Sequence, residues 1–452
     1  MIPDLYIRNG RIITENSDFY GGIVIAGEKI HQLVAGNHNL DAKTELDAQG
    51  KTVLPGLIDP HVHFSEPRPD QYEGFFTGTM AAAAGGITSV IEMPLNASPP
   101  TINGERLRAK QAVVEQKALI DVGLWGGLVD NNLADLPDLI DGGVLALKAF
   151  MSDSASDFAR ADDDIIFAGL QFAAQHDIPV GVHCENEYIT RYLKEQLQKN
   201  GRKDLAAWPE SRPPFQELEA IDRAINLAKA ANGNLHIVHV SQGEGIRKTI
   251  QARHNGVRVT NETCPQYLLL DHDDYLRIGP TAKCAPVIRQ RELVEALWQT
   301  VLAGQVDIIA SDHSPCLVSQ KAGAADNVWQ IWGGISGVQT MLPGIITEGV
   351  HNRGLSLSLL VKMMSTNPAR IFGLYPQKGS LQPGTDADIT VVDLDKEWTL
   401  TEEMLCYHSK HSAFVGYPFK GQVTQTLVRG KTVWQDGQLR CKPGYGRLIR
   451  RV

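Results

Sequence analysis

The stretch TVLPGLIDPHVH, residues 52–63, is the most informative segment of the chain. Its first half is an apolar run rich in branched side chains, which is typical of a buried strand. Side chains on a strand alternate between its two faces, so His61 and His63 are expected to point the same way. Two imidazoles at the end of one buried strand supply half of a divalent-metal site. The two histidines could equally be hydrogen-bonded surface residues without a metal. The rest of the chain has to decide between these two interpretations.

Length and composition indicate a globular protein with room for one large domain and one smaller domain. The chain has 452 residues, of which 43% are hydrophobic and 21% are charged. The net charge of −9 argues against nucleic acid as the main partner, because phosphate binding needs a basic surface. We expect neither a secretory signal nor a membrane span, because no apolar run approaches the required length.

The cysteines are scattered and lack Cys-x-x-Cys spacing. They are expected to be free thiols, which favours a cytoplasmic protein over a secreted one. They are Cys184, Cys264, Cys284, Cys316, Cys406 and Cys441.

Both ends of the chain carry short strand patterns separated by turns. Residues 5–7, 11–13 and 22–25 form such patterns near the start, and residues 388–392 and 426–430 form them near the end. We therefore expect a small β-sandwich domain built from residues 1–53 and 373–452.

The middle of the chain alternates between apolar strand-like runs and helical patterns. Amphipathic stretches such as residues 217–231 and 289–303 follow most of the runs. Eight β-then-α units predict a (β/α)8 barrel over residues 54–372. The expected strands begin near Leu57, Ile87, Leu119, Val144, Pro179, Leu235, Val257 and Val306.

Potential metal ligands follow the ends of these strands, where barrel enzymes carry their chemistry. Their side chains should meet at one rim, because the carboxyl ends of all eight strands lie there. The candidates are His61 and His63 after the first strand, Lys148 on the fourth, His183 on the fifth, His239 on the sixth and Asp312 on the eighth. His236 and His313 are interpreted as neighbours of the site rather than ligands, His236 as a structural residue between barrel and helices.

Lys148 is the most informative single candidate, because a charged ammonium inside an apolar strand is costly to bury. It has to pair with a carboxylate, lose its proton or be modified. A neutral amine reacts with CO2 to give a carbamate, which is a bidentate oxygen ligand able to bridge two metals. With the other five candidates at matching strand ends, we favour the carbamate over a simple ion pair.

The six candidate ligands together predict a site for two metal ions. His61, His63 and Asp312 would hold one metal ion, and His183 and His239 the other, with carbamylated Lys148 and a hydroxide between them. The cluster would remain slightly positive and so lower the pKa of bound water. Imidazole and carboxylate ligands favour Zn, with Mn, Co or Fe as alternatives.

These motifs together resemble the cyclic amidohydrolases of the amidohydrolase superfamily, over essentially the whole chain. The resemblance rests on HVH at 61–63, GGITSVIEMPLN at 85–96, KAF at 148–150, HCEN at 183–186, HVS at 239–241, ETCP at 262–265, SDHSP at 311–315, NPARIFGL at 367–374 and KGSLQPGTDAD at 378–388. It implies ring opening of a cyclic amide, with Asp312 accepting the proton of the nucleophile and passing it to the leaving nitrogen. A homotetramer follows by analogy alone.

Departures from two branches of the family narrow the expected substrate. Dihydroorotases typically carry an arginine where this chain has Ser65, so a substrate carboxylate is not expected. Hydantoinases typically carry a tyrosine shortly after the modified lysine, and residues 149–154 contain none. Residues 282–289, 314–316 and 332–339 most resemble the allantoinase branch, whose substrate is a neutral ring with a ureido arm. Expected substrate contacts are Ser65, Asn96, Ser152, Cys284, Gly333 and Gly334.

Two alternatives remain open. Within the family, the chain could be a dihydroorotase or a broad hydantoinase. Outside enzymes, it could be a metal-free scaffold on the same fold, although that interpretation predicts missing ligands and all six are present. The polar residues 152–164 and the charged, irregular residues 187–214 could each cover the site, with a solvated surface loop as the default.

Overall fold

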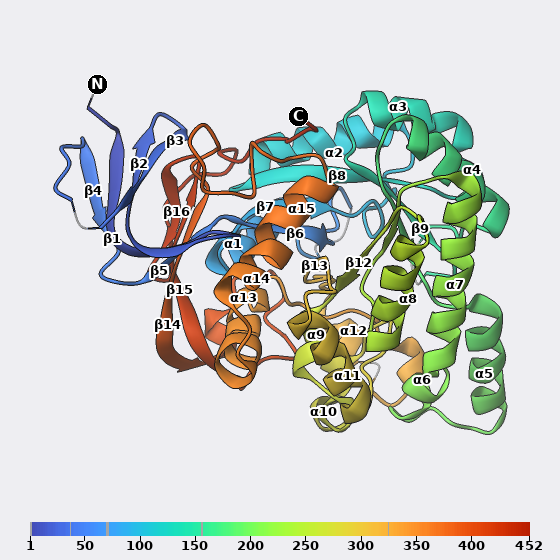
Figure 1. Cartoon of the computed structure of the whole chain (residues 1–452). Coiled ribbons are helices and arrows are strands. Elements are labelled where there is room, and N and C mark those ends of the chain that lie inside the picture. The colour runs from blue at the N-terminus through green and yellow to red at the C-terminus, as the bar shows by residue number, and fades with distance from the viewer. Residues whose placement is uncertain (1, 37, 69–71, 155–156, 324) are drawn as a thin grey trace.

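A computed structural model describes residues 2–36, 38–68, 72–154, 157–323 and 325–452 (Figure 1). Eight parallel strands form a nearly closed barrel, as the sequence predicts. A backbone hydrogen bond of 2.7 Å from His63 to His313 and a bridge between Val62 and His313 join the first strand to the end of the last. The barrel strands are β6 (Leu57–Val62), β7 (Ile87–Glu92), β8 (Asp121–Gly127), β9 (Ala146–Phe150), β10 (Val180–His183), β11 (Leu235–Ile237), β12 (Val259–Thr263) and β13 (Ile308–Ile309).

Helices cover the outside of the barrel, and shorter ones fill its connections (Figure 1). Each expected strand begins within two residues of an observed one. The α-helices are α1 (Phe75–Ala84), α2 (Gly104–Lys117), α3 (Leu136–Asp141), α4 (Asp163–Gln175), α5 (Glu187–Lys199), α6 (Ala207–Glu210), α7 (Pro214–Ala231), α8 (Gly243–His254), α9 (Pro265–Leu269), α10 (His272–Ile278), α11 (Arg291–Leu302), α12 (Val318–Ala322), α13 (Met341–Ile345), α14 (Leu357–Val361) and α15 (Asn367–Ile371). Short 3₁₀ segments lie at Leu133–Asp135, Gly279–Ala282, Val328–Gln330 and Glu402–Met404, and π-helical segments at Ile346–His351 and Lys362–Thr366.

Both chain ends build a separate mixed sheet beside the barrel, at the left of Figure 1. The sheet has its own apolar core, in which Ile25 and Leu427 come from opposite ends of the chain. The domain boundaries expected at residues 53 and 373 remain predictions. The strands of this sheet are β1 (Leu5–Ile13), β2 (Asp18–Ala26), β3 (Lys29–Ala35), β4 (Thr44–Asp47), β5 (Thr52–Pro55), β14 (Ile389–Thr399), β15 (Pro418–Val428), β16 (Lys431–Gln435) and β17 (Gln438–Leu439).

The apolar run at residues 52–58 is two strands rather than the single strand expected from its composition. β5 belongs to the mixed sheet and β6 to the barrel, and the chain passes between them at Gly56. The Gly56 amide donates a 2.8 Å hydrogen bond to the Asp388 carbonyl, and a Cβ at this position would lie 2.2 Å from the Thr88 hydroxyl. Only glycine permits that close approach, so the run is interrupted where the two sheets meet.

Two further expectations need correction. The first two N-terminal patterns form one strand, β1, because Asn9 takes a left-handed conformation (φ 56°) and the pairing with β2 shifts register there as a bulge instead of turning. Residues 187–214 are largely helical rather than irregular, since they contain α5 and α6. Part of the stretch at 152–164 lies outside the described residues, and α4 begins near its end.

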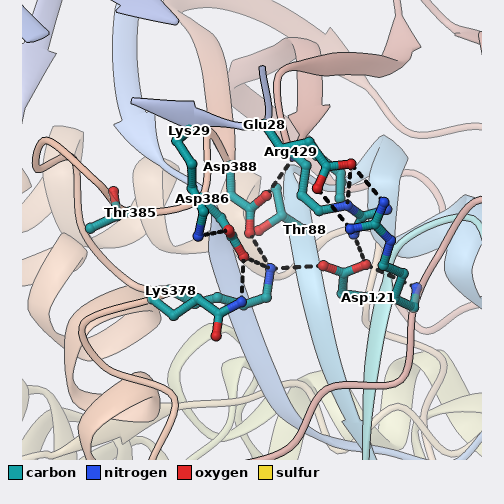
Figure 2. A network of polar contacts seen from close by, with 12 residues as sticks. Glu28, Lys29, Thr88, Asp121, Lys378, Thr385, Asp386, Asp388 and Arg429 are labelled. Atoms are coloured by element: carbon teal, nitrogen blue, oxygen red, sulfur yellow. Dashed lines mark hydrogen bonds and ion pairs between the residues drawn. The ribbon is translucent and has the colours of Figure 1, made fainter. Parts of the chain in front are cut away.

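A buried ionic network ties the mixed sheet to the barrel (Figure 2). The Lys378 amine lies 2.7 Å from a carboxylate oxygen of Asp121 on β8 and 2.7 Å from one of Asp388 beside β14. A carboxylate oxygen of Asp386 lies 3.0 Å from the same amine, and Arg429 also pairs with Asp121. Three carboxylates therefore converge on the Lys378 ammonium, and Asp386 also forms an ion pair with Lys29.

Among the described helices, none is both long and apolar enough to cross a membrane. The six cysteines are unpaired, as the sequence predicts.

Candidate metal centre

Three of the expected ligands converge at the joint between the first and last barrel strands. One carboxylate oxygen of Asp312 lies 3.2 Å from His61 Nε2 and 3.3 Å from His63 Nε2. All three side chains are buried or nearly so. Ligand atoms from the three residues lie within 4.8 Å of one another, which is the spacing of a shared cation.

The remaining two histidines face each other beside this group. His183 at the end of β10 places Nδ1 2.9 Å from Nε2 of His239, which follows β11. The His239 ring also lies 5.3 Å from the His61 ring, centroid to centroid. The five side chains thus form two adjacent sets of nitrogen and oxygen donors at one rim of the barrel.

The orientation of the His239 and Asp312 side chains depends on an unusual backbone conformation and not on strand alternation alone. β11 ends at Ile237, and His239 has a φ of 39°. Asp312 has a φ of 46° beyond the end of β13. Non-glycine residues rarely occupy this region, and such strain is concentrated at functional sites.

Lys148 lies on β9, fully buried, and its amine has no hydrogen-bond partner among the residues that the structure describes. Burial lowers the pKa of Lys148 to about 8, although the carboxylates of Asp312 and Glu262 oppose that shift. The amine is therefore available in its neutral form near physiological pH. An unpartnered amine in this position fits the reaction with CO2 that the sequence predicts.

Glu262 on β12 is an important residue that sequence reasoning did not assign. One of its carboxylate oxygens accepts hydrogen bonds from His61 Nδ1 at 2.7 Å and from the His239 amide at 3.1 Å. Burial alone would raise the pKa of Glu262, but His61 and His236 lower it well below its usual range. A carboxylate at the end of a barrel strand was the available signal, since it matches the pattern of the other candidates.

The Glu262 contact decides the protonation of His61. Its Nδ1 carries the proton that Glu262 accepts, so Nε2 presents a lone pair toward the Asp312 carboxylate. Burial lowers the pKa of His61 and so favours this neutral ring. A lone pair facing a carboxylate oxygen at 3.2 Å calls for a cation between them. This arrangement, the buried Lys148 amine and the nitrogen and oxygen donors all fit a divalent-metal site.

A second carboxylate, Glu185, orients His183. Its oxygen lies 3.0 Å from His183 Nε2, and its other oxygen accepts a 3.1 Å hydrogen bond from Gln216. Burial would raise the pKa of Glu185, but the Arg212 guanidinium and His183 hold it at about 2. The sequence placed Glu185 in a family motif without giving it this role.

A cavity of about 280 Å³ opens over the candidate ligands. His61, His63, His183, His239 and Asp312 line it. Of the expected substrate contacts, Asn96, Ser152 and Gly333 line it as well. Sequence reasoning did not identify Phe150, Trp208, Arg212, Lys283, Trp329 and Trp332, which also line the cavity.

Ser65, Cys284 and Gly334 do not belong to the cavity lining and lie behind it. The Ser65 hydroxyl donates to the His63 carbonyl at 3.3 Å. The Cys284 carbonyl accepts a 2.8 Å hydrogen bond from Trp208, and the Gly334 amide donates to the Lys283 carbonyl. Their polar groups are therefore engaged within the protein, and the contacts expected of them remain predictions.

His236 and His313 lie near the candidate ligands but outside the two donor sets. His236 bonds Thr260 at 2.8 Å and approaches the second oxygen of Glu262 at 3.5 Å. Its ring packs against Phe372 of a core cluster formed by inner barrel residues, so it does not point toward the outer helices as expected. His313 Nδ1 accepts a 3.1 Å hydrogen bond from the Gly337 amide.

Comparisons with known proteins agree with this geometry. Residues 52–433 match the model of the amidohydrolase family. A protein named allantoinase from Rubrobacter xylanophilus is 44% identical over 452 residues, covering 99% of this chain and 97% of that protein. One of the same name from Deinococcus radiodurans is 41% identical, covering 100% and 99%.

Solved structures show the same architecture. The L-hydantoinase (dihydropyrimidinase) of Arthrobacter aurescens matches with a TM-score of 0.97 and 35% identity over 100% of both chains. The dihydropyrimidinase of Brevibacillus agri matches with a TM-score of 0.91 and 32% identity, over 99% of this chain and 98% of that one.

Proposed function

The chain belongs to the amidohydrolase family, and we propose that it hydrolyses the cyclic amide of allantoin to allantoate. The main support for allantoin as the substrate is the similarity to proteins named allantoinase, at 40% identity or more over nearly the full length. The expected contacts that line the cavity, Asn96, Ser152 and the backbone of Gly333, can hold a neutral ring by hydrogen bonds. Arg212 and Lys283 line the same cavity, so its lining by itself does not select a neutral substrate.

The family implies a binuclear metal centre, and the donor sets described above suit one. His61, His63 and Asp312 would hold one ion, His183 and His239 the other, and a carbamate on Lys148 would bridge them. Zinc is the preferred metal, with manganese, cobalt or iron as alternatives. When bound, the ions would lower the pKa of a coordinated water and polarise the amide carbonyl.

Asp312 is the proposed proton carrier. Burial opposes its ionisation, but His61 and His63 lower the pKa of Asp312, so it is a carboxylate at neutral pH. It accepts a proton from the attacking water as the new C–O bond forms at the amide carbon. It then returns that proton to the ring nitrogen as the C–N bond breaks, giving an open-chain carboxylic acid that loses its remaining proton to solvent and becomes the carboxylate. Glu262 and Glu185 hold the histidine rings in place during both steps.

A hydantoinase is the alternative with a specific observation in its favour, namely the TM-score of 0.97 to a solved L-hydantoinase. The identity to that protein is lower than to the relatives named allantoinase. A metal-free scaffold is disfavoured by the complete ligand set. A homotetramer, a cytoplasmic location and the contacts of Ser65, Cys284 and Gly334 remain predictions.

Steady-state kinetics on three substrates test the proposal. The purified protein, with its metal content measured, is assayed on allantoin, unsubstituted hydantoin and dihydroorotate. The specificity constant kcat/KM is expected to be largest for allantoin. A larger value for either of the others would replace allantoin as the substrate, and metal-free protein after growth with adequate zinc would contradict the binuclear site.

A further inference from the structure

One side of the candidate cavity is a segment with little regular structure. Residues 328–334, here named the cavity wall, contain one short 3₁₀ turn at Val328–Gln330. Trp329, Ile331, Trp332 and Gly333 of this wall line the cavity. Because no strand or long helix holds these residues, other contacts must fix where the two indoles lie.

Lys283 makes the first of those contacts. Its side chain is 3% exposed, and its amine donates to the Val328 carbonyl at 2.8 Å and to the Ile331 carbonyl at 2.5 Å. The amine also lies 3.8 Å from the centroid of the Trp208 ring. The Lys283 amine therefore donates to two carbonyls of the wall and lies against one aromatic face.

Lys321 on α12 makes the second set of contacts. It is 3% exposed, and its amine donates to the Lys283 carbonyl and the Trp332 carbonyl, both at 2.9 Å. The Gly334 amide donates to the same Lys283 carbonyl at 3.0 Å. The two lysine side chains therefore bind the wall at three carbonyls, those of Val328, Ile331 and Trp332.

Two buried lysines whose amines face carbonyls and an aromatic ring, without a carboxylate partner among the described residues, are a costly arrangement. Within the described part of the chain, neither Lys283 nor Lys321 forms an ion pair with a carboxylate. Buried lysines are normally paired, and an apolar side chain could support a loop with less desolvation. What the amines provide instead is a defined position for three backbone carbonyls of the wall.

We propose that Lys283 and Lys321 are positioning residues that hold the cavity wall in the shape required by the substituent on the cyclic amide, and so determine substrate preference. This inference rests on the proposed function. The reacting amide has to reach the histidines and Asp312, so a substituent on the ring must occupy the remaining cavity, which the wall lines. Lys321 does not line the cavity and its amine bonds no candidate metal ligand, so the reaction itself is expected to be preserved without it.

Kinetics of Lys283→Met and Lys321→Met on two substrates test the proposal. Allantoin carries a ureido arm and unsubstituted hydantoin does not. In each variant kcat/KM for allantoin is expected to fall about tenfold or more, mainly through KM. In Lys321→Met, which changes no residue of the cavity lining, the value for hydantoin is expected to stay within about threefold. Metal content should be unchanged. Lys199→Met, at an exposed position on α5, is the matched control and should alter neither ratio.

A purely structural role would lower both activities together or lower the melting temperature alone, and either result would overturn the proposal. Lys321→Gln keeps one donor for a carbonyl and is the milder variant if the methionine variants do not fold. It should show an intermediate loss of preference, and an unchanged preference in this variant also overturns the proposal. If the unmodified enzyme does not hydrolyse allantoin, the proposed function is wrong. The ratio of kcat/KM for a 5-substituted hydantoin to kcat/KM for hydantoin then tests the role of the two lysines independently.

Discussion

Removal of the Glu262 carboxylate should weaken metal binding without unfolding the protein. Glu262 accepts the Nδ1 proton of His61 at 2.7 Å and the amide proton of His239 at 3.1 Å. A hydrogen bond to a charged partner contributes about 1.5–3 kcal/mol, and partners of metal-binding histidines commonly affect metal affinity about 10- to 100-fold. Glu262→Ala leaves the His61 ring without its orienting acceptor, so we expect metal affinity to fall about 10- to 100-fold.

Glu262→Gln separates the charge from the hydrogen bond. The amide oxygen can still accept from His61 and His239, so only the charge of the acceptor is lost. That difference is about 1 kcal/mol, and a loss of about fivefold in metal affinity follows. The alanine variant should therefore be clearly weaker than the glutamine variant.

Equilibrium competition against a chromogenic chelator measures these affinities, and circular dichroism checks that each variant is folded. Glu195→Ala, at an exposed position on α5, is the matched control and should bind metal as the unmodified protein does. A folded Glu262→Ala protein whose metal affinity lies within about twofold of the original would show that Glu262 does not orient His61.

Three further predictions follow from the site and the fold. Lys148→Ala should abolish metal retention and activity together, as measured by elemental analysis and assay; full retention of both would refute a bridging carbamate. Lys378→Met should lower the free energy of unfolding by about 3–5 kcal/mol in urea titrations, because it removes the ammonium that three buried carboxylates share (Figure 2); a loss below about 1 kcal/mol would contradict this. Ser152→Ala should raise KM for allantoin about two- to tenfold, whereas Ser65→Ala should change it less, because only Ser152 lines the cavity; the reverse order would show that Ser65 contacts substrate.

Much of the architecture could be predicted because it depends on local pattern. Apolar runs of strand length followed by amphipathic stretches indicate a parallel barrel, and each expected strand begins within two residues of an observed one. The error at residues 52–58 had a non-local cause, since composition does not show that a run changes sheets. At Gly56 the approach of Thr88 and Asp388 makes that decision, and both residues are distant in sequence.

The fold class and the candidate ligands follow from the pattern of residues along the chain, because side chains that end parallel strands must share one rim. The orientation of those side chains depends on contacts that form only in the folded protein. His239 and Asp312 follow the ends of their strands, where backbone φ values of 39° and 46° replace strand alternation. Glu262 lies 201 residues from His61, and Lys283 lies 45 and 48 residues from the carbonyls it holds. Such contacts have no sequence period, since they arise from packing between distant segments.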